Sequence, residues 1–221
     1  MDEITAATSI VPLGPDTWPL FADLNVRQSG TLFSNCWCTW FHPDCAGREL
    51  DPDLASRDAK ERLILAGEAH AALVVVDGRA VAWATYGPPE ELPRIHHRRQ
   101  YDATHVGPPV DYRIACIQVE RTRRRQGYAE AALRGAVDLI AAAGGGLVEG
   151  YPHDLAAKLA AGKKTSASFL YNGTRTMYER VGFTYDRPKG LGNCVMRMRV
   201  DPIGPLVGPD ATRTGPAPHR P

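Results

Sequence analysis

One fifteen-residue stretch limits the possible folds of this chain more than any other. The segment VERTRRRQGYAEAAL, residues 119–133, follows an almost continuously apolar run and changes to helical spacing at Tyr128. A buried strand, a short arginine-rich turn and a helix are therefore expected in immediate succession. The turn contains Gly127, which lets the backbone come close to a ligand. Backbone amides at such a helix N-terminus bind phosphate, and neighbouring arginines add charge-assisted contacts, so the stretch predicts a phosphate site.

This stretch resembles the signature of the GNAT superfamily of acyl-CoA-dependent N-acyltransferases. The signature is an arginine or glutamine, two variable residues, a glycine, one variable residue, and a glycine or alanine. Arg124, Gly127 and Ala129 match it here. A second family signature places a tyrosine four residues before Gly-Phe, and Tyr178 matches it in YERVGF. The resemblance covers roughly residues 60 to 200 and contains both motifs in the family's order.

The resemblance implies a mixed α/β fold, with a twisted, mostly antiparallel sheet flanked by helices and splayed next to the strand ending at Val119. Periodicity and turn residues agree with it and predict helices and strands in the following order. The expected elements are two helices (15–27 and 54–69), a hairpin (70–87) turning at Asp77-Gly78, a strand (111–119), a helix from 128, a strand (147–151), a helix (173–183) and a strand (193–200).

The resemblance also implies the domain organisation. We expect a single N-acetyltransferase domain over residues 1–202, in which residues 1–60 supply N-terminal helices and a loop on the substrate side. Residues 203–221 are rich in proline and glycine, so a disordered tail is expected there. The segment 151–168 is expected to form a loop over the cleft.

The co-substrate implied by the resemblance is acetyl-CoA or another acyl-CoA. Its pyrophosphate would sit on the backbone amides of the arginine-rich turn, and its pantetheine arm would run along the edge of the preceding strand. Many family members also carry an asparagine seven residues before the tyrosine. Tyr171 holds that place here, and Asn172 follows it. The residues expected to contact coenzyme A are Ile117, Val119, Arg124, Arg125, Gln126, Gly127, Tyr128, Ala129 and Asn172.

The resemblance also assigns catalytic roles. The backbone N–H of Val119 would donate to the thioester carbonyl, and Tyr178 would protonate the departing thiolate. Many members carry a general base on the strand before the turn, but this strand offers no carboxylate or histidine between residues 112 and 118. Glu120 and Glu149 are the remaining candidates for that base. The alternatives are an amine that arrives neutral, or a base from the N-terminal part.

The expected function is transfer of an acetyl or short acyl group from coenzyme A to a primary amine of a small molecule, by direct attack in a ternary complex. One alternative is a non-catalytic acyl-CoA sensor, and another is acylation of an aminoacyl-tRNA or protein amine. The formal net charge of +1 disfavours a nucleic-acid partner. A homodimer is compatible with the sequence. The acidic N-terminus and the lack of a long apolar run predict a cytoplasmic protein without membrane spans.

The segment CWCTWFHPDC places Cys36, Cys38, His42 and Cys45 close together. The gap of one residue between the first two cysteines is shorter than in most zinc sites, so we expect no metal. We expect instead an aromatic segment over the core or the substrate cleft, from which Trp37, Trp40 and Phe41 contact the acceptor. Cys116 could act as a covalent nucleophile, but a packing role is expected for a cysteine within a strand.

Overall fold

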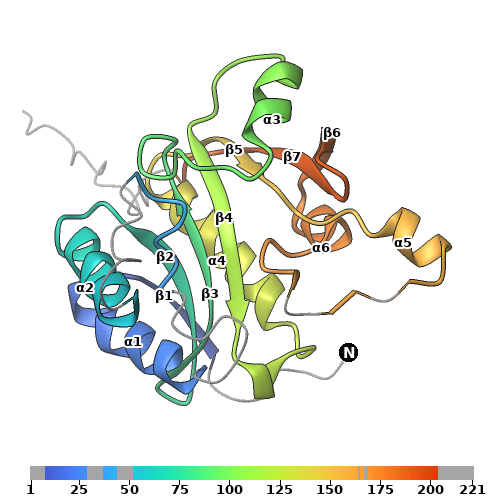
Figure 1. Cartoon of the computed structure of the whole chain (residues 1–221). Helices are drawn as coiled ribbons and strands as arrows, with labels where there is room; N and C mark the ends of the chain where they lie inside the picture. Colours follow the sequence, from blue (N-terminus) through green and yellow to red (C-terminus); the bar gives the residue numbers. More distant parts are fainter. Residues whose placement is uncertain (1–7, 29–36, 44–51, 164, 167–168, 204–221) are drawn as a thin grey trace, which may run out of the picture.

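Seven strands form one mixed sheet in the order β1-β2-β3-β4-β5-β7-β6. The computed structural model describes residues 8–28, 37–43, 52–163, 165–166 and 169–203 (Figure 1). Every pair of neighbouring strands is antiparallel except β4 with β5, which confirms the predicted mixed α/β fold. The strands are β1 (Thr8–Pro12), β2 (His70–Val76), β3 (Arg79–Gly87), β4 (Tyr112–Val119), β5 (Gly146–Gly150), β6 (Thr184–Lys189) and β7 (Asn193–Val200).

Helices cover both faces of this sheet. On one face α4 packs against β2, β3 and β4, and α6 lies beside it; on the other face α1 packs against β3, with α2 next to it (Figure 1). Because each face of the sheet is buried, most residues of β2 and β3 are apolar whichever way they point. The helical segments are η1 (Pro15–Thr17), α1 (Trp18–Arg27), α2 (Pro52–Leu65), α3 (Arg98–Thr104), η2 (Arg121–Arg123), α4 (Tyr128–Ala142), α5 (Ala156–Ala160) and α6 (Arg175–Val181).

The elements with strong local signals lie where the sequence predicts them. The β2–β3 hairpin turns at Asp77 and Gly78, whose φ angles of 51° and 74° are those of the predicted type I′ turn. The helices predicted at 15–27, 54–69, 128 onward and 173–183 are all present, with ends shifted by a few residues. The strands predicted before and after α4 and at the end are present too.

Four elements were missed by the sequence analysis. Strands β1 and β6 are the two edges of the sheet, where exposed polar residues and a proline are tolerated, so neither shows an apolar alternation. The short helices α3 and α5 lie in segments that the sequence left unassigned or predicted as loop. A few residues of helix give too little periodicity to be recognised.

The predicted splay is present beside β4. Strand β4 pairs with β5 only through Tyr112, Arg113 and Ile114, whereas it continues to Val119. The β3–β4 register shifts opposite Thr85, so β4 also carries an irregularity just before it leaves β5. The last part of β4 therefore has one edge that no neighbouring strand covers.

Two further predicted segments, the C-terminal tail and the substrate-side loop, lie largely outside the described residues. Residues 204–221, nearly all of the predicted tail, lie outside them, as do 29–36 and 44–51 of the predicted substrate-side loop. Among the described residues no helix has the length and apolarity needed to cross a membrane.

Candidate functional site

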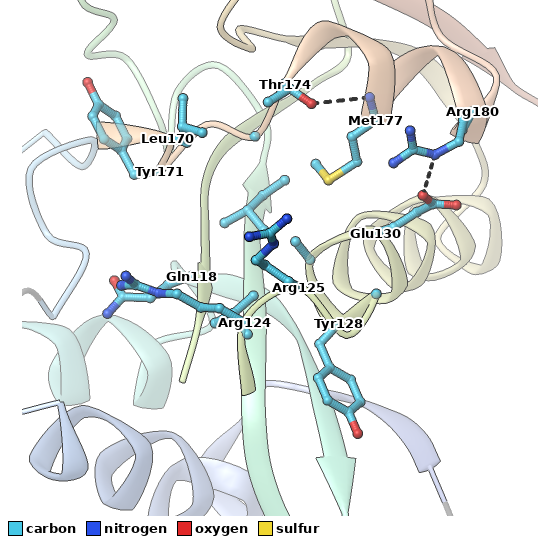
Figure 2. A pocket seen from close by; sticks show the side chains of 15 residues that line it. Gln118, Arg124, Arg125, Tyr128, Glu130, Leu170, Tyr171, Thr174, Met177 and Arg180 are labelled. Atoms are coloured by element: carbon cyan, nitrogen blue, oxygen red, sulfur yellow. Dashed lines mark hydrogen bonds and ion pairs between the residues drawn. The ribbon is translucent and has the colours of Figure 1, made fainter. Parts of the chain in front are cut away.

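A pocket of about 390 Å³ lies where β4 leaves β5 (Figure 2). Its walls come from four parts of the fold: the end of β4, the arginine-rich turn, the first turn of α4, and α6 with the loop before it. Seven of the predicted cofactor residues line it, namely Ile117, Val119, Arg124, Arg125, Gly127, Tyr128 and Ala129. The structure thus brings most of the motif residues to one concave surface.

The N-terminus of α4 opens into this pocket. Gly127 is its N-cap with a φ of 85°, a left-handed conformation that suits glycine, and no side chain caps the helix. A Cβ built on Gly127 would meet no atom within 4 Å, so the space in front of the backbone is open. The first amides of a fifteen-residue helix, with the positive end of its dipole, therefore face space in which an anion fits.

Two arginines add positive charge to the pocket. Figure 2 shows Arg125 pointing toward the centre of the pocket and Arg124 extending toward Gln118. Glu130 also lines the pocket, but its carboxylate accepts hydrogen bonds from Arg180 at 2.7 Å and Arg134 at 3.0 Å. Although partial burial raises the pKa of Glu130, these arginines lower it overall, so the carboxylate stays ionised and paired. The charge left available to a ligand is positive.

The open edge of β4 forms the inner wall of the pocket. The N–H of Ile117 donates to the carbonyl of Tyr171 over 2.6 Å, so this N–H points away from β3. The N–H of Glu120 donates to Val81 of the β3 side instead. Because backbone direction alternates along a strand, the N–H of Val119 points to the same open edge as that of Ile117. This edge can bind an extended chain of amides, as the Tyr171 contact illustrates.

Tyr178 lies directly behind the pocket wall rather than in it. Its side chain is fully buried, and its ring packs over Gly150 at the end of β5 and beside Gly173, a pocket residue. The Tyr178 hydroxyl has no hydrogen-bond partner among the described residues, which is unusual for a buried tyrosine. Burial raises the pKa of this hydroxyl, so it remains protonated at neutral pH.

Two of the residues predicted to contact coenzyme A, Gln126 and Asn172, do not line the pocket, and Tyr128 lines it through its backbone. Gln126 is exposed, does not line the pocket, and bonds to the carbonyl of Thr122 at 3.4 Å. The ring of Tyr128 points away from the pocket and packs in the core, so only its backbone faces the pocket (Figure 2). Asn172 is buried outside the pocket and donates to the carbonyl of Tyr151 at 3.1 Å. This amide anchors the loop before α6 to the end of β5.

Neither predicted general base lines the pocket. Glu120 forms a short ion pair with Arg27, the last residue of α1, and so connects that helix to the turn. Glu149 is fully buried, and its carboxylate accepts hydrogen bonds from Arg197 at 2.7 Å and from the hydroxyls of Tyr101 at 2.7 Å and Tyr151 at 3.1 Å. Both carboxylates are occupied by internal partners, and this geometry argues against the proton-transfer role predicted for them.

The opposite face of the splay carries a group of rings that we call the histidine–aromatic cluster: Trp40, His96, His153 and Tyr171. The rings of Trp40 and His96 stack with centroids 3.9 Å apart, and Tyr171 lies 5.8 Å from His96 and 5.7 Å from His153. Tyr171 also lines the pocket, so the cluster adjoins the end of β4. No sequence signal distinguished the two histidines, because they come from separate loops.

The cysteine-rich segment is divided between two hydrophobic clusters. Cys38 and Phe41 pack against Cys116 of β4, close to Trp40 and Tyr171, whereas Trp37 packs with Trp18 and Phe21 in the core under α1. Trp37 therefore takes the core position, one of the two predicted for this segment, and contact of Trp40 and Phe41 with an acceptor stays a prediction. Cys36 and Cys45 lie outside the described residues. Within the described part of the chain, no three histidine, cysteine or acidic side chains come together as metal ligands.

No family model matches the chain, and no curated protein matches it either. Among solved structures, the chain is similar to GNAT-family acetyltransferases. The GNAT-family acetyltransferase of Streptococcus agalactiae is 13% identical, covering 89% of this chain and 98% of its own, with a TM-score of 0.47. The Bacillus cereus GNAT-family acetyltransferase is 12% identical over 87% and 96%, with a TM-score of 0.46. The Escherichia coli ribosomal-protein-S18-alanine N-acetyltransferase is 13% identical over 91% and 99%, with a TM-score of 0.43.

Proposed function

We propose that this chain is a GNAT-superfamily N-acyltransferase that moves an acetyl or short acyl group from coenzyme A to a primary amine of a small molecule. The observation that carries the proposal is the uncapped N-terminus of α4, which opens at Gly127 into a pocket containing two arginines and the free edge of β4. The positive charge at one end of the pocket suits the pyrophosphate of coenzyme A. The free edge of β4 at the other end suits the amides of its extended pantetheine arm.

The residues around the pocket suit each part of that co-substrate. The amides from Gly127 to Ala129, with Arg124 and Arg125, would hold the pyrophosphate. The pantetheine arm would follow the edge of β4 at Ile117 and Val119. Open space in front of Gly127 and a pocket of about 390 Å³ support this fit, since a bulky phosphate needs both.

The chemistry proposed is direct attack of a neutral amine on the thioester carbon. The new C–N bond forms, the C–S bond breaks, and the released thiolate takes a proton from the Tyr178 hydroxyl. The nitrogen loses one proton to solvent as the amide forms, and the Tyr178 oxygen regains a proton from solvent. The N–H of Val119 would stabilise the developing oxyanion at the carbonyl. The lone hydroxyl of Tyr178 supports its role, because a buried donor without a partner is satisfied once an acceptor such as a thiolate reaches it. Holding the amine and thioester together supplies much of the rate.

An acyl-CoA sensor is the second candidate. It is favoured by the lack of an unpaired carboxylate on the pocket, since Glu130 is bound by two arginines. Release of thiol from acetyl-CoA in the presence of an amine panel separates the two functions, because a sensor binds without turnover.

The test is calorimetric titration of acetyl-CoA into the wild-type protein and into Gly127→Glu. The added carboxylate would fill the space in front of the helix and repel phosphate, so we expect binding to be lost. Gly144→Glu is the matched control, because Gly144 lies just past the other end of α4, also has a positive φ, and also has open space around its Cβ position. Equal affinity of wild type and Gly127→Glu, or no binding to either, would contradict the proposed site.

A further inference from the structure

A buried cation without a counter-ion lies near the histidine–aromatic cluster. Lys189, the last residue of β6, is 1% exposed, and its Nζ lies 5.0 Å from the centroid of the Tyr151 ring. It forms no hydrogen bond and no ion pair with any residue that the structure describes. Burying an ammonium group costs free energy unless an anion compensates for it.

The carboxylate that acts on Lys189 is already held by other partners. Glu149 contributes to the electrostatic surroundings of Lys189, but Arg197, Tyr101 and Tyr151 already hold its oxygens. As a result, burial lowers the pKa of the Lys189 ammonium to about 8, so most of it is still charged at neutral pH. The carboxylate of Asp154, the residue after His153, pairs with Arg175 at 3.0 Å.

A second unsatisfied donor comes from His153. The amide nitrogen of Asn193 donates to the carbonyl of Tyr151 at 3.2 Å and to Nδ1 of His153 at 3.4 Å. Since Nδ1 accepts, the neutral ring carries its proton on Nε2. That Nε2 is buried and has no partner among the described residues. Burial, together with the charges of Lys158 and Lys189, lowers the pKa of His153 to about 4, which keeps the ring neutral.

Two lysines bring positive charge to the neighbourhood of these donors. Burial is the largest cause of the lowered pKa of His96 and of His153, and Lys189 lowers both further, with Lys158 also acting on His153. The His153 ring in turn contacts Tyr171, which lines the coenzyme A pocket. A negatively charged group bound here would lie next to the place where an amine must meet the thioester.

We propose that the acceptor amine carries a carboxylate, which binds to the Lys189 ammonium and to the Nε2–H of His153. The substrate is then of the amino-acid class, with its amine directed past Tyr171 toward the end of β4. This inference rests on the proposed acyltransferase function for the identity of the reacting amine, but the anion site itself does not depend on turnover.

The experiment compares matched pairs of amines, each an amino acid and its carboxamide, by calorimetric titration into protein saturated with coenzyme A. We expect the carboxylate member of at least one pair to bind roughly 10- to 150-fold more tightly, the range for a hydrogen bond to a charged group. Lys189→Met should abolish the difference, whereas Lys189→Arg, which keeps the charge, should retain part of it. Both substitutions preserve the bulk of the side chain, and a melting curve checks that each variant is folded.

Several results would overturn the inference. Equal binding of acids and amides by the wild type would do so, as would a preference that survives in Lys189→Met. If Lys189 were a general base instead, both variants would lose kcat equally while the affinity for the acid stayed unchanged. Phosphoethanolamine binding more tightly than every amino acid would replace carboxylate by phosphate. If coenzyme A does not bind, the proposed function fails, and the same pairs titrated into the free protein still test the anion site.

Discussion

Substituting Gly150 by alanine should displace the Tyr178 ring and reduce turnover. A Cβ at position 150 would lie 2.1 Å from Cε1 of Tyr178 and 2.8 Å from its hydroxyl oxygen. Ordinary contacts begin at 3.4 Å, so the ring must move by 1.3 Å, the difference between 3.4 and 2.1. The backbone of Gly150 pairs with Ile114 on one side and Met196 on the other, and so the strand is held in place.

The ring has little room to make this movement. The Phe183 ring lies 4.9 Å from that of Tyr178, and the site is fully buried. Overpacking of this kind costs about 1–3 kcal/mol of folding free energy. A displacement on the order of 1 Å at a reacting group lowers kcat by roughly 100-fold. The affinity for acetyl-CoA should change little, because Gly150 does not line the pocket.

Thiol release and calorimetry on the same preparations measure the two effects. Gly14→Ala is the control, because a Cβ at Gly14 would meet nothing within 4 Å. Tyr178→Phe should also lower kcat, and Gly150→Ala should lower it no further in the Tyr178→Phe background, since the hydroxyl is already gone. Full kcat in Gly150→Ala with an unchanged melting temperature would refute this reasoning, as would additive losses in the double variant.

Two further predictions concern stability. His42 is fully buried, and its pKa is lowered to about 3, first by burial and then by the charge of Lys60. Below pH 6.5 the unfolded chain therefore takes up a proton at this histidine that the folded protein does not. The contribution of His42 to stability should therefore be complete above pH 6.5 and decline by up to about 1.4 kcal/mol per pH unit toward pH 3. Measured by urea unfolding, the free energy of unfolding of His42→Gln should fall less than that of wild type between pH 7 and pH 5. The same fall in both proteins would contradict the low pKa of His42. Glu120→Gln should cost about 1 kcal/mol through the lost pair with Arg27 and leave kcat unchanged; a large fall in kcat with normal stability would restore Glu120 as the base.

The elements that position the pocket could be predicted because their signals are local. The strand ending at Val119, the turn with Gly127 and the helix that follows are each specified by residues within a few positions of one another. The spacing of apolar residues and a single glycine are sufficient to predict such backbone geometry, as they were for the β2–β3 turn. The same locality explains why seven of the predicted cofactor residues lie on one surface.

The partners of the charged and polar side chains were decided only by the tertiary structure. Glu149 was a candidate base until Arg197 and two tyrosines, distant in sequence or on other elements, proved to surround it. Edge strands β1 and β6 carry little pattern of their own, because one side of an edge faces no other strand.

The sequence by itself determined the strand–turn–helix unit and the order of the main elements, since backbone conformation depends on neighbours along the chain. Only the tertiary structure decided that the buried Tyr178 hydroxyl would have no hydrogen-bond partner among the described residues, and that the buried Lys189 ammonium would face the Tyr151 ring, because burial depends on which distant segments pack around a side chain. The cost of leaving a hydroxyl or an ammonium unsatisfied is set by the dielectric of that packed environment, and it exists only once the chain has folded.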